Sequence, residues 1–60
     1  MSLTRSLPNW PDHITDEVRA IVREFPRMAA FTVALELHVR TGYEVSGEEV
    51  YLWMLHENHR

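Results

Sequence analysis

The side chains best suited to contact another molecule are arginines, and three of them follow one another at intervals of four residues. Residues four apart lie on one face of a helix, so this spacing predicts a basic stripe. Guanidinium groups bind phosphates and carboxylates through charge-assisted hydrogen bonds. The stripe suits contact with nucleic acid or an acidic partner, or simple ion pairing with Asp16 and Glu24. The arginines considered for nucleic-acid contact are Arg5, Arg19, Arg23, Arg27 and Arg40.

Residue types that serve catalysis or metal binding are present without the spacing that either role needs. Ser46 stands where a helix should begin, so we interpret it as a cap and not as a nucleophile. His56 and His59 fall near the end of the same helix, where the helix dipole favours imidazoles, and we expect His38 to be partly buried on another helix. The sequence has no cysteine. We therefore expect no enzyme activity, no metal and no cofactor.

The elements that carry these residues must fit in 60 residues, of which 45% are hydrophobic and 25% are charged. This size allows one small domain and leaves little room for a preorganised pocket. No apolar run approaches the length of a membrane span, and the N-terminal residues lack the apolar core of a signal peptide. We expect a cytoplasmic protein with no membrane partner.

The charge is uneven along the chain. The formal net charge is −3, and residues 31–60 contain five glutamates and only two arginines. Phosphate contacts dominate the affinity of nucleic-acid-binding proteins. An acidic C-terminal half therefore disfavours nucleic acid as the partner of that half.

Helical periodicity predicts two helices before the first glycine. The first is expected over Thr15–Phe25, with Thr15 as its N-cap and Pro26 as its stop. The second is expected over Met28–Thr41, followed by Gly42 in the left-handed conformation that ends many helices. The second helix is apolar on nearly all sides, so it cannot hide its whole surface in so short a chain.

A third helix is expected over Gly47–Asn58. Ser46 and Glu49 have the spacing of a capping box, in which each side chain binds the backbone N–H of the other residue. Val45, in the connection before it, is expected to plug the core. No segment predicts a strand.

The prolines predict an extended N-terminal arm over residues 1–14, in front of a three-helix domain over residues 15–60. We expect Trp10 to fold back onto the helices, because an indole gains much from burial. The expected core consists of Val18, Ile21, Val22, Phe25, Ala34, Leu37, Val50, Trp53 and Met54.

Residues 37–54 resemble the helix-turn-helix of homeodomain-like DNA-binding domains, including those of transposases. The resemblance implies an all-α, three-helix homeodomain-like bundle. It rests on a leucine before Thr-Gly, a Val-Ser pair that opens the last helix, and an apolar stripe in that helix. The matching residues are Leu37, Thr41, Gly42, Val45, Ser46, Val50, Trp53 and Met54.

The last helix departs from this family at the positions that should read DNA. Such helices present Arg, Lys, Asn or Gln to base edges, whereas the outward positions here are acidic or apolar. A surface of aromatic and aliphatic side chains with a charged rim is typical of protein contacts. The predicted protein-contact residues are Phe31, Leu35, Glu48, Tyr51, Leu52 and Leu55.

A second, weaker resemblance is to the ubiquitin-binding CUE and UBA-like domains. Phe25-Pro26 stands at the end of the first helix, and Met54-Leu55 stands near the end of the third. Glu24 occupies the position where those domains carry methionine, and the second helix is longer than theirs. The resemblance implies a peptide-binding module.

Three functions follow from these observations. The first is a small regulatory adaptor that binds another protein, or itself as a two-fold homodimer, through the predicted contact residues. The second is a helix-turn-helix DNA-binding transcriptional regulator that uses the surface of Arg19, Arg23, Arg27 and Arg40. The third is the UBA/CUE-like module. By analogy, the small size also suits an accessory protein of a phage or mobile element.

Overall fold

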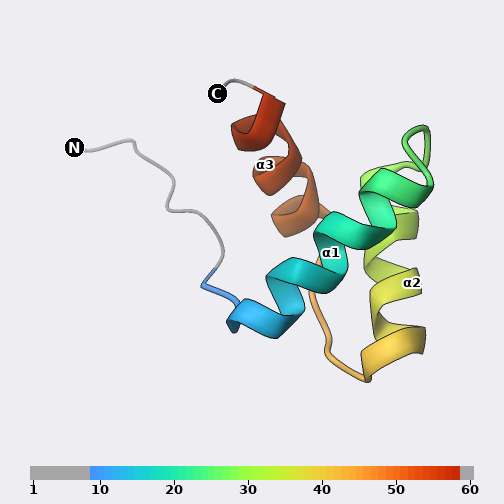
Figure 1. Ribbon diagram of the computed structural model, residues 1–60, viewed down its shortest axis with the longest axis vertical. Coiled ribbons are helices and arrows are strands. Elements are labelled where there is room, and N and C mark those ends of the chain that lie inside the picture. The colour runs from blue at the N-terminus through green and yellow to red at the C-terminus, as the bar shows by residue number, and fades with distance from the viewer. Residues whose placement is uncertain (1–8, 59–60) are drawn as a thin grey trace.

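The computed structural model describes residues 9–58, which form three α-helices (Figure 1). Helix α1 spans Asp12–Glu24, α2 spans Ala30–Thr41 and α3 spans Gly47–Asn58. No strand occurs in this part of the chain. The prediction of an all-α fold with three helices is therefore confirmed.

Helix α1 begins three residues earlier than expected. Pro11 is its N-cap, and the Pro11 carbonyl accepts hydrogen bonds from the N–H groups of Ile14 and Thr15, both at 3.0 Å. A proline tolerates this place because its missing N–H would have no helical partner there. The prediction that Thr15 caps the helix is wrong: Thr15 lies within it and its hydroxyl donates to the Pro11 carbonyl. Residues 12–14, expected in the arm, belong to α1.

The connection between α1 and α2 is longer than predicted. Phe25, at the C-cap of α1, is no longer in a helical conformation, since its φ is −128°. Its side chain is 40% exposed, so its predicted place in the core is wrong. Helix α2 begins at Ala30 and not at Met28, because residues 26–27 form a turn in which the Met28 N–H donates to the Phe25 carbonyl at 3.0 Å. Ala29 at its N-cap has no side chain that can accept a hydrogen bond.

The predicted end of α2 and the predicted start of α3 are both confirmed. Gly42 has φ +80°, and its N–H donates to the His38 carbonyl at 2.7 Å. Ser46 and Glu49 form the predicted capping box: the Ser46 Oγ accepts from the Glu49 N–H, and the Glu49 Oε1 accepts from the Ser46 N–H, both at 3.1 Å. Helix α3 consequently has the predicted bounds.

One apolar core joins the three helices. Val22 and Met54, predicted to be buried, are only partly covered and pack against its edge, as does Val45. Ile14 and Val33 were not predicted and are fully buried, because each continues the inward stripe of its helix. The buried residues are Ile14, Val18, Ile21, Val33, Ala34, Leu37, Val50 and Trp53.

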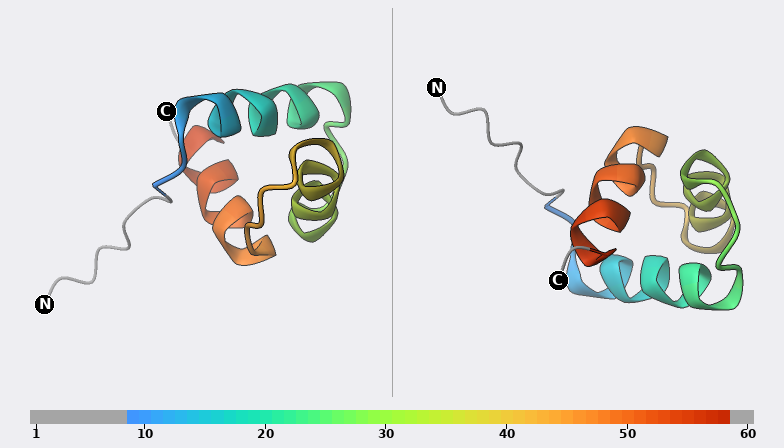
Figure 2. Two further views of the ribbon diagram at one scale, coloured as in Figure 1. Left: turned by 90° about the horizontal axis from the view of Figure 1, so that it is seen from below. Right: turned by 90° about the horizontal axis from the view of Figure 1, so that it is seen from above.

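Helices α2 and α3 lie on the same side of α1, as both views in Figure 2 show, and α3 reaches α1 where the Arg19 guanidinium lies 5.5 Å from the centre of the Trp53 ring. Trp10 contributes to this contact, because its ring centroid lies 6.2 Å from that of Trp53 with the planes tilted by 40°. The prediction that Trp10 folds onto the helices is confirmed. Helix α2 packs against both other helices.

Among residues 9–58, no helix is long and apolar enough to cross a membrane.

Candidate protein-interaction surface

Helices α2 and α3 expose large apolar side chains. On α2, Phe31 is 66% exposed and Leu35 is 53% exposed. On α3, Tyr51 is 55% exposed and Leu55 is 39% exposed. All four belong to the predicted protein-contact residues, and we call them the apolar face. Aromatic and aliphatic side chains that remain exposed on so small a domain are typical of interfaces.

The two halves of the apolar face meet where α2 approaches the start of α3. A Cβ added at Gly47 would lie only 3.0 Å from the Phe31 Cα. The close approach of the two backbones therefore favours glycine, because any other side chain would require α2 to shift by a few tenths of an ångström. Tyr51 follows Gly47 by about one helical turn, so it lies on the same side of α3 as the contact with Phe31.

A groove of about 550 Å³ lies between α2 and the connection that leads into α3. Phe31 and Leu35 line it from α2, and Val45 lines it from the connection. Glu44 and Glu49 also line this groove. The sequence identified Phe31 and Leu35 but not the wall opposite them, because that wall depends on how the connection folds back. We call this the acidic groove.

The remaining predicted contact residues lie near the apolar face with different exposure. Glu48 is exposed in the first turn of α3. Leu52 is half-buried, so it offers less surface to a partner than Leu55. Val39 was not among the predicted contact residues, although it is 78% exposed on α2. The only feature of the sequence that could have identified Val39 was its position in the apolar periodicity of α2.

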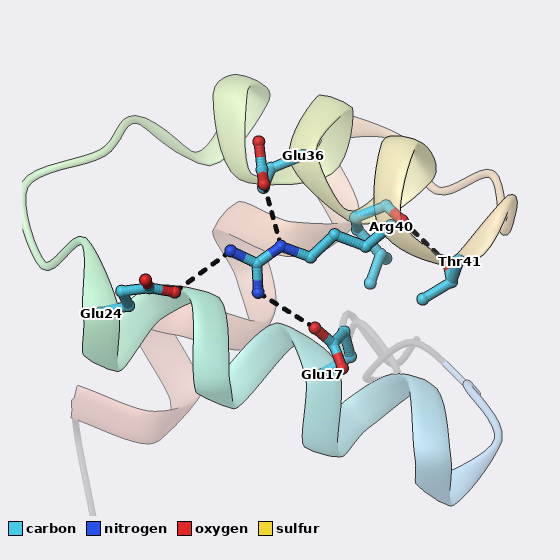
Figure 3. A network of polar contacts seen from close by, with 6 residues as sticks. Glu17, Glu24, Glu36, Arg40 and Thr41 are labelled. Carbon is cyan, nitrogen blue, oxygen red and sulfur yellow. Dashed lines mark hydrogen bonds and ion pairs between the residues drawn. The ribbon is translucent and has the colours of Figure 1, made fainter.

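Arg40 does not extend the arginine stripe but lies between α1 and α2, among three carboxylates (Figure 3). Its Nε donates to Glu36 at 2.9 Å, and its two terminal nitrogens donate to Glu17 and Glu24 at 3.1 Å each. These hydrogen bonds, that of Glu36 first, raise the pKa of the Arg40 guanidinium above its ordinary value. The Arg40 guanidinium therefore already binds carboxylates of its own chain.

Arg19 and Arg23 lie on a different side of α1, facing α3. The Arg19 guanidinium lies 5.5 Å from the centre of the Trp53 ring and forms ion pairs with Asp16 and Glu57 at 3.5 and 3.8 Å. The pairing of the stripe with Asp16 is therefore present, whereas Glu24 pairs with Arg40 instead.

A hollow of about 460 Å³ between α1 and α3 is lined in part by Arg19 and Arg23. Pro26 and Met54, two residues of the CUE and UBA-like resemblance, also line it. Arg27 lies beyond α1, in the connection to α2. Arg5 lies outside the described residues.

The histidines within residues 9–58 lie on three different helices. His38 is exposed on α2, so the expectation that it is partly buried is wrong, and His56 is exposed on α3. His59 lies outside the described residues. Within residues 9–58 no three histidine, aspartate or glutamate side chains gather as a metal site would require.

Comparison of the chain with protein-family models, with curated proteins and with solved structures finds no match. The resemblance of residues 37–54 to homeodomain-like domains stays a prediction.

Proposed function

We propose that this protein is a small regulatory adaptor, a helix-turn-helix-like module that binds another protein through the apolar face of α2 and α3. The observation that carries the proposal is the exposure of Phe31, Leu35, Tyr51 and Leu55 on two helices that touch at Gly47. Burial stabilises by about 25 cal/mol per Å² of apolar surface. A partner that covers these side chains would therefore gain a substantial part of its binding free energy from them.

The charge of α3 supports a protein partner over DNA. The described part of the chain has no arginine or lysine after Arg40, and α3 begins with Glu48 and Glu49. These carboxylates would repel phosphates if α3 entered a DNA groove. Of the arginines suited to phosphate contact, Arg40 is already held by three glutamates and Arg19 by two acids.

Site-specific photo-cross-linking tests the proposal against DNA binding. Benzoylphenylalanine would replace either Tyr51 on the apolar face or Arg27 in the connection between α1 and α2. Each variant would be made separately, in the cells that make the protein. Ala20, which is exposed on α1, provides a control position. We expect one protein adduct from position 51 and none from position 20. Nucleic-acid adducts from position 27, with no protein adduct from position 51, would support the DNA-binding alternative and overturn the proposal.

A matched substitution checks that the adduct reports binding. Leu55→Glu places a charge on the apolar face, and Leu55 is exposed enough for the fold to tolerate it. We expect it to abolish the adduct from position 51 while far-UV circular dichroism stays unchanged. An undiminished adduct from a folded Leu55→Glu protein would contradict the role of the apolar face.

A further inference from the structure

We propose that the acidic groove binds a cationic amphipathic helix of another protein, and not a second copy of this chain. This inference rests on the proposed function and adds the chemistry of the partner. It concerns the part of the apolar face contributed by Phe31 and Leu35, together with the carboxylates that flank it.

The shape of the groove favours a helix as its occupant. Phe31 and Leu35 lie one turn apart on α2, and Val45 faces them from the connection. Residues 9–58 contain no strand, so they offer no sheet edge to which an extended peptide could add. A groove lined by apolar side chains one helical turn apart suits an amphipathic helix, which places its own apolar side chains, spaced three or four apart, into such a groove.

The charges around the groove favour a cationic occupant. Glu44 lines the groove, and Glu48 is exposed in the first turn of α3. Neither carboxylate has an ion-pair partner within the described part of the chain. Among the described residues that line the groove, His38 is the only one with a basic side chain. Lysine or arginine residues beside the apolar stripe of a partner would meet these carboxylates.

The same charges disfavour the two-fold homodimer expected from the sequence. A two-fold dimer brings the same surface of both copies together. Glu44 and Glu48 of both copies would then be brought into one interface, with no arginine or lysine after Arg40 in the described residues to offset them. Like charges that face each other across an interface oppose binding.

Binding of synthetic peptides tests the inference directly. The probe is a fluorescent amphipathic helix of leucine and lysine, about 15 residues long. It is compared by anisotropy with a leucine–glutamate helix of the same pattern and with a scrambled leucine–lysine peptide. We expect the leucine–lysine helix to bind at least about tenfold more tightly than either, and salt to weaken its binding. Equal binding of the scrambled peptide would overturn the inference, since attraction between opposite charges would then explain the binding without an amphipathic helix.

A charge reversal with a matched control tests the location of the site. In Glu44→Lys/Glu48→Lys, we expect the preference to switch to the leucine–glutamate helix. Asp12→Lys/Asp16→Lys makes the same change in net charge on α1, away from the groove, and should leave the preference as it is. If both double variants behave alike, the groove does not select the charge of its partner and the inference fails. Phe31→Ser, at an exposed position, should weaken binding of the leucine–lysine helix about tenfold.

Sedimentation equilibrium separates failure of this inference from failure of the proposed function. We expect a monomer. A dimer that Phe31→Ser converts to a monomer would show that a second copy occupies the groove, which overturns the inference and leaves the apolar face as a protein-binding surface. A monomer that binds none of the peptides, and yields no protein adduct from position 51, would overturn both.

Discussion

Arg40 on α2 donates a hydrogen bond of 3.1 Å to Glu17 on α1, although 23 positions separate them in the sequence. The same guanidinium binds Glu24, also on α1, and Glu36 on its own helix (Figure 3). One cation therefore holds two helices together and neutralises carboxylates from both. Without it, three negative charges would face one another at this contact.

Replacement of Arg40 by methionine should lower the thermal midpoint by several degrees, because the three glutamates lose their shared cation and repel one another. Thermal unfolding followed by circular dichroism would measure this. The loss should shrink in about 1 M salt, which screens exposed charges. Arg27→Met, which removes a cation outside the network, is the control and should leave the midpoint nearly unchanged. An equal loss in both variants would contradict the role of the network.

The contribution of Arg40 should not change with pH in the range where proteins are ordinarily studied. The folded protein raises the pKa of Arg40. A raised pKa gives stability that is present at low pH and is lost only as the pH rises through the folded-state pKa. Because that pKa lies far above neutrality, deprotonation of Arg40 should not alter the difference in midpoint between Arg40→Met and the parent protein from about pH 7 to pH 10. A difference that disappears within this interval would be unexpected.

The rings of the Trp10 indole should contribute to the stability of the fold, whereas its N–H group should not. Within the described residues, the Trp10 Nε1 is buried and has no hydrogen-bond acceptor. Trp10→Phe removes this unpaired donor while keeping an aromatic ring against Trp53, so it should change the free energy of unfolding by less than about 1 kcal/mol. Trp10→Ala should cost about 1–3 kcal/mol. Urea denaturation would measure both, and equal losses would contradict this account.

Gly42 should resist substitution because of its backbone and not because of crowding. Its φ is +80°, yet apart from its two chain neighbours no atom of the described residues lies within 4 Å of an added Cβ. Gly42→Ala should therefore destabilise by about 1 kcal/mol through backbone strain alone. Gly42→Asn should cost less, since asparagine tolerates the left-handed region. Equal free energies of unfolding for the alanine variant and the parent would argue against this reason.

Gly47 should resist substitution for the opposite reason. A Cβ at this position would crowd the Phe31 Cα at 3.0 Å. Although alanine favours helices by about 1 kcal/mol, Gly47→Ala should destabilise the protein by about 1–3 kcal/mol, because α2 must move away from α3. Adding Phe31→Ala should not restore stability, because the nearest atom belongs to the backbone. A full rescue in the double variant would show that only the side chain is crowded.

Local signals in the sequence were sufficient for the second half of the fold. Gly42, Ser46 and Glu49 act within four residues of themselves, so their roles do not depend on how the helices pack. The start of α1 was missed because Pro11 caps it without a side-chain hydrogen bond, whereas Thr15 has the residue type of a usual cap.

The candidate site depends on packing and was less predictable. Exposure of Phe31 and Tyr51 followed from an excess of apolar positions over what one small core can hold. The partners of Arg40 did not follow, because Glu17 and Glu24 belong to another helix and meet it only after α1 and α2 pack. From the sequence, Arg40 was instead placed on one surface with Arg19, Arg23 and Arg27, although Arg40 was expected on a different helix.

The contact between Trp10 and Trp53 joins residues near opposite ends of the sequence. It closes a loop that contains α1, α2 and the first part of α3, so forming it carries the entropy cost of closing a long loop. Unfolding should accordingly be all-or-none, without a stage in which one helix leaves alone. Cutting the chain next to Trp10 with a protease, or pulling on it there, should therefore also destabilise the packing around Trp53.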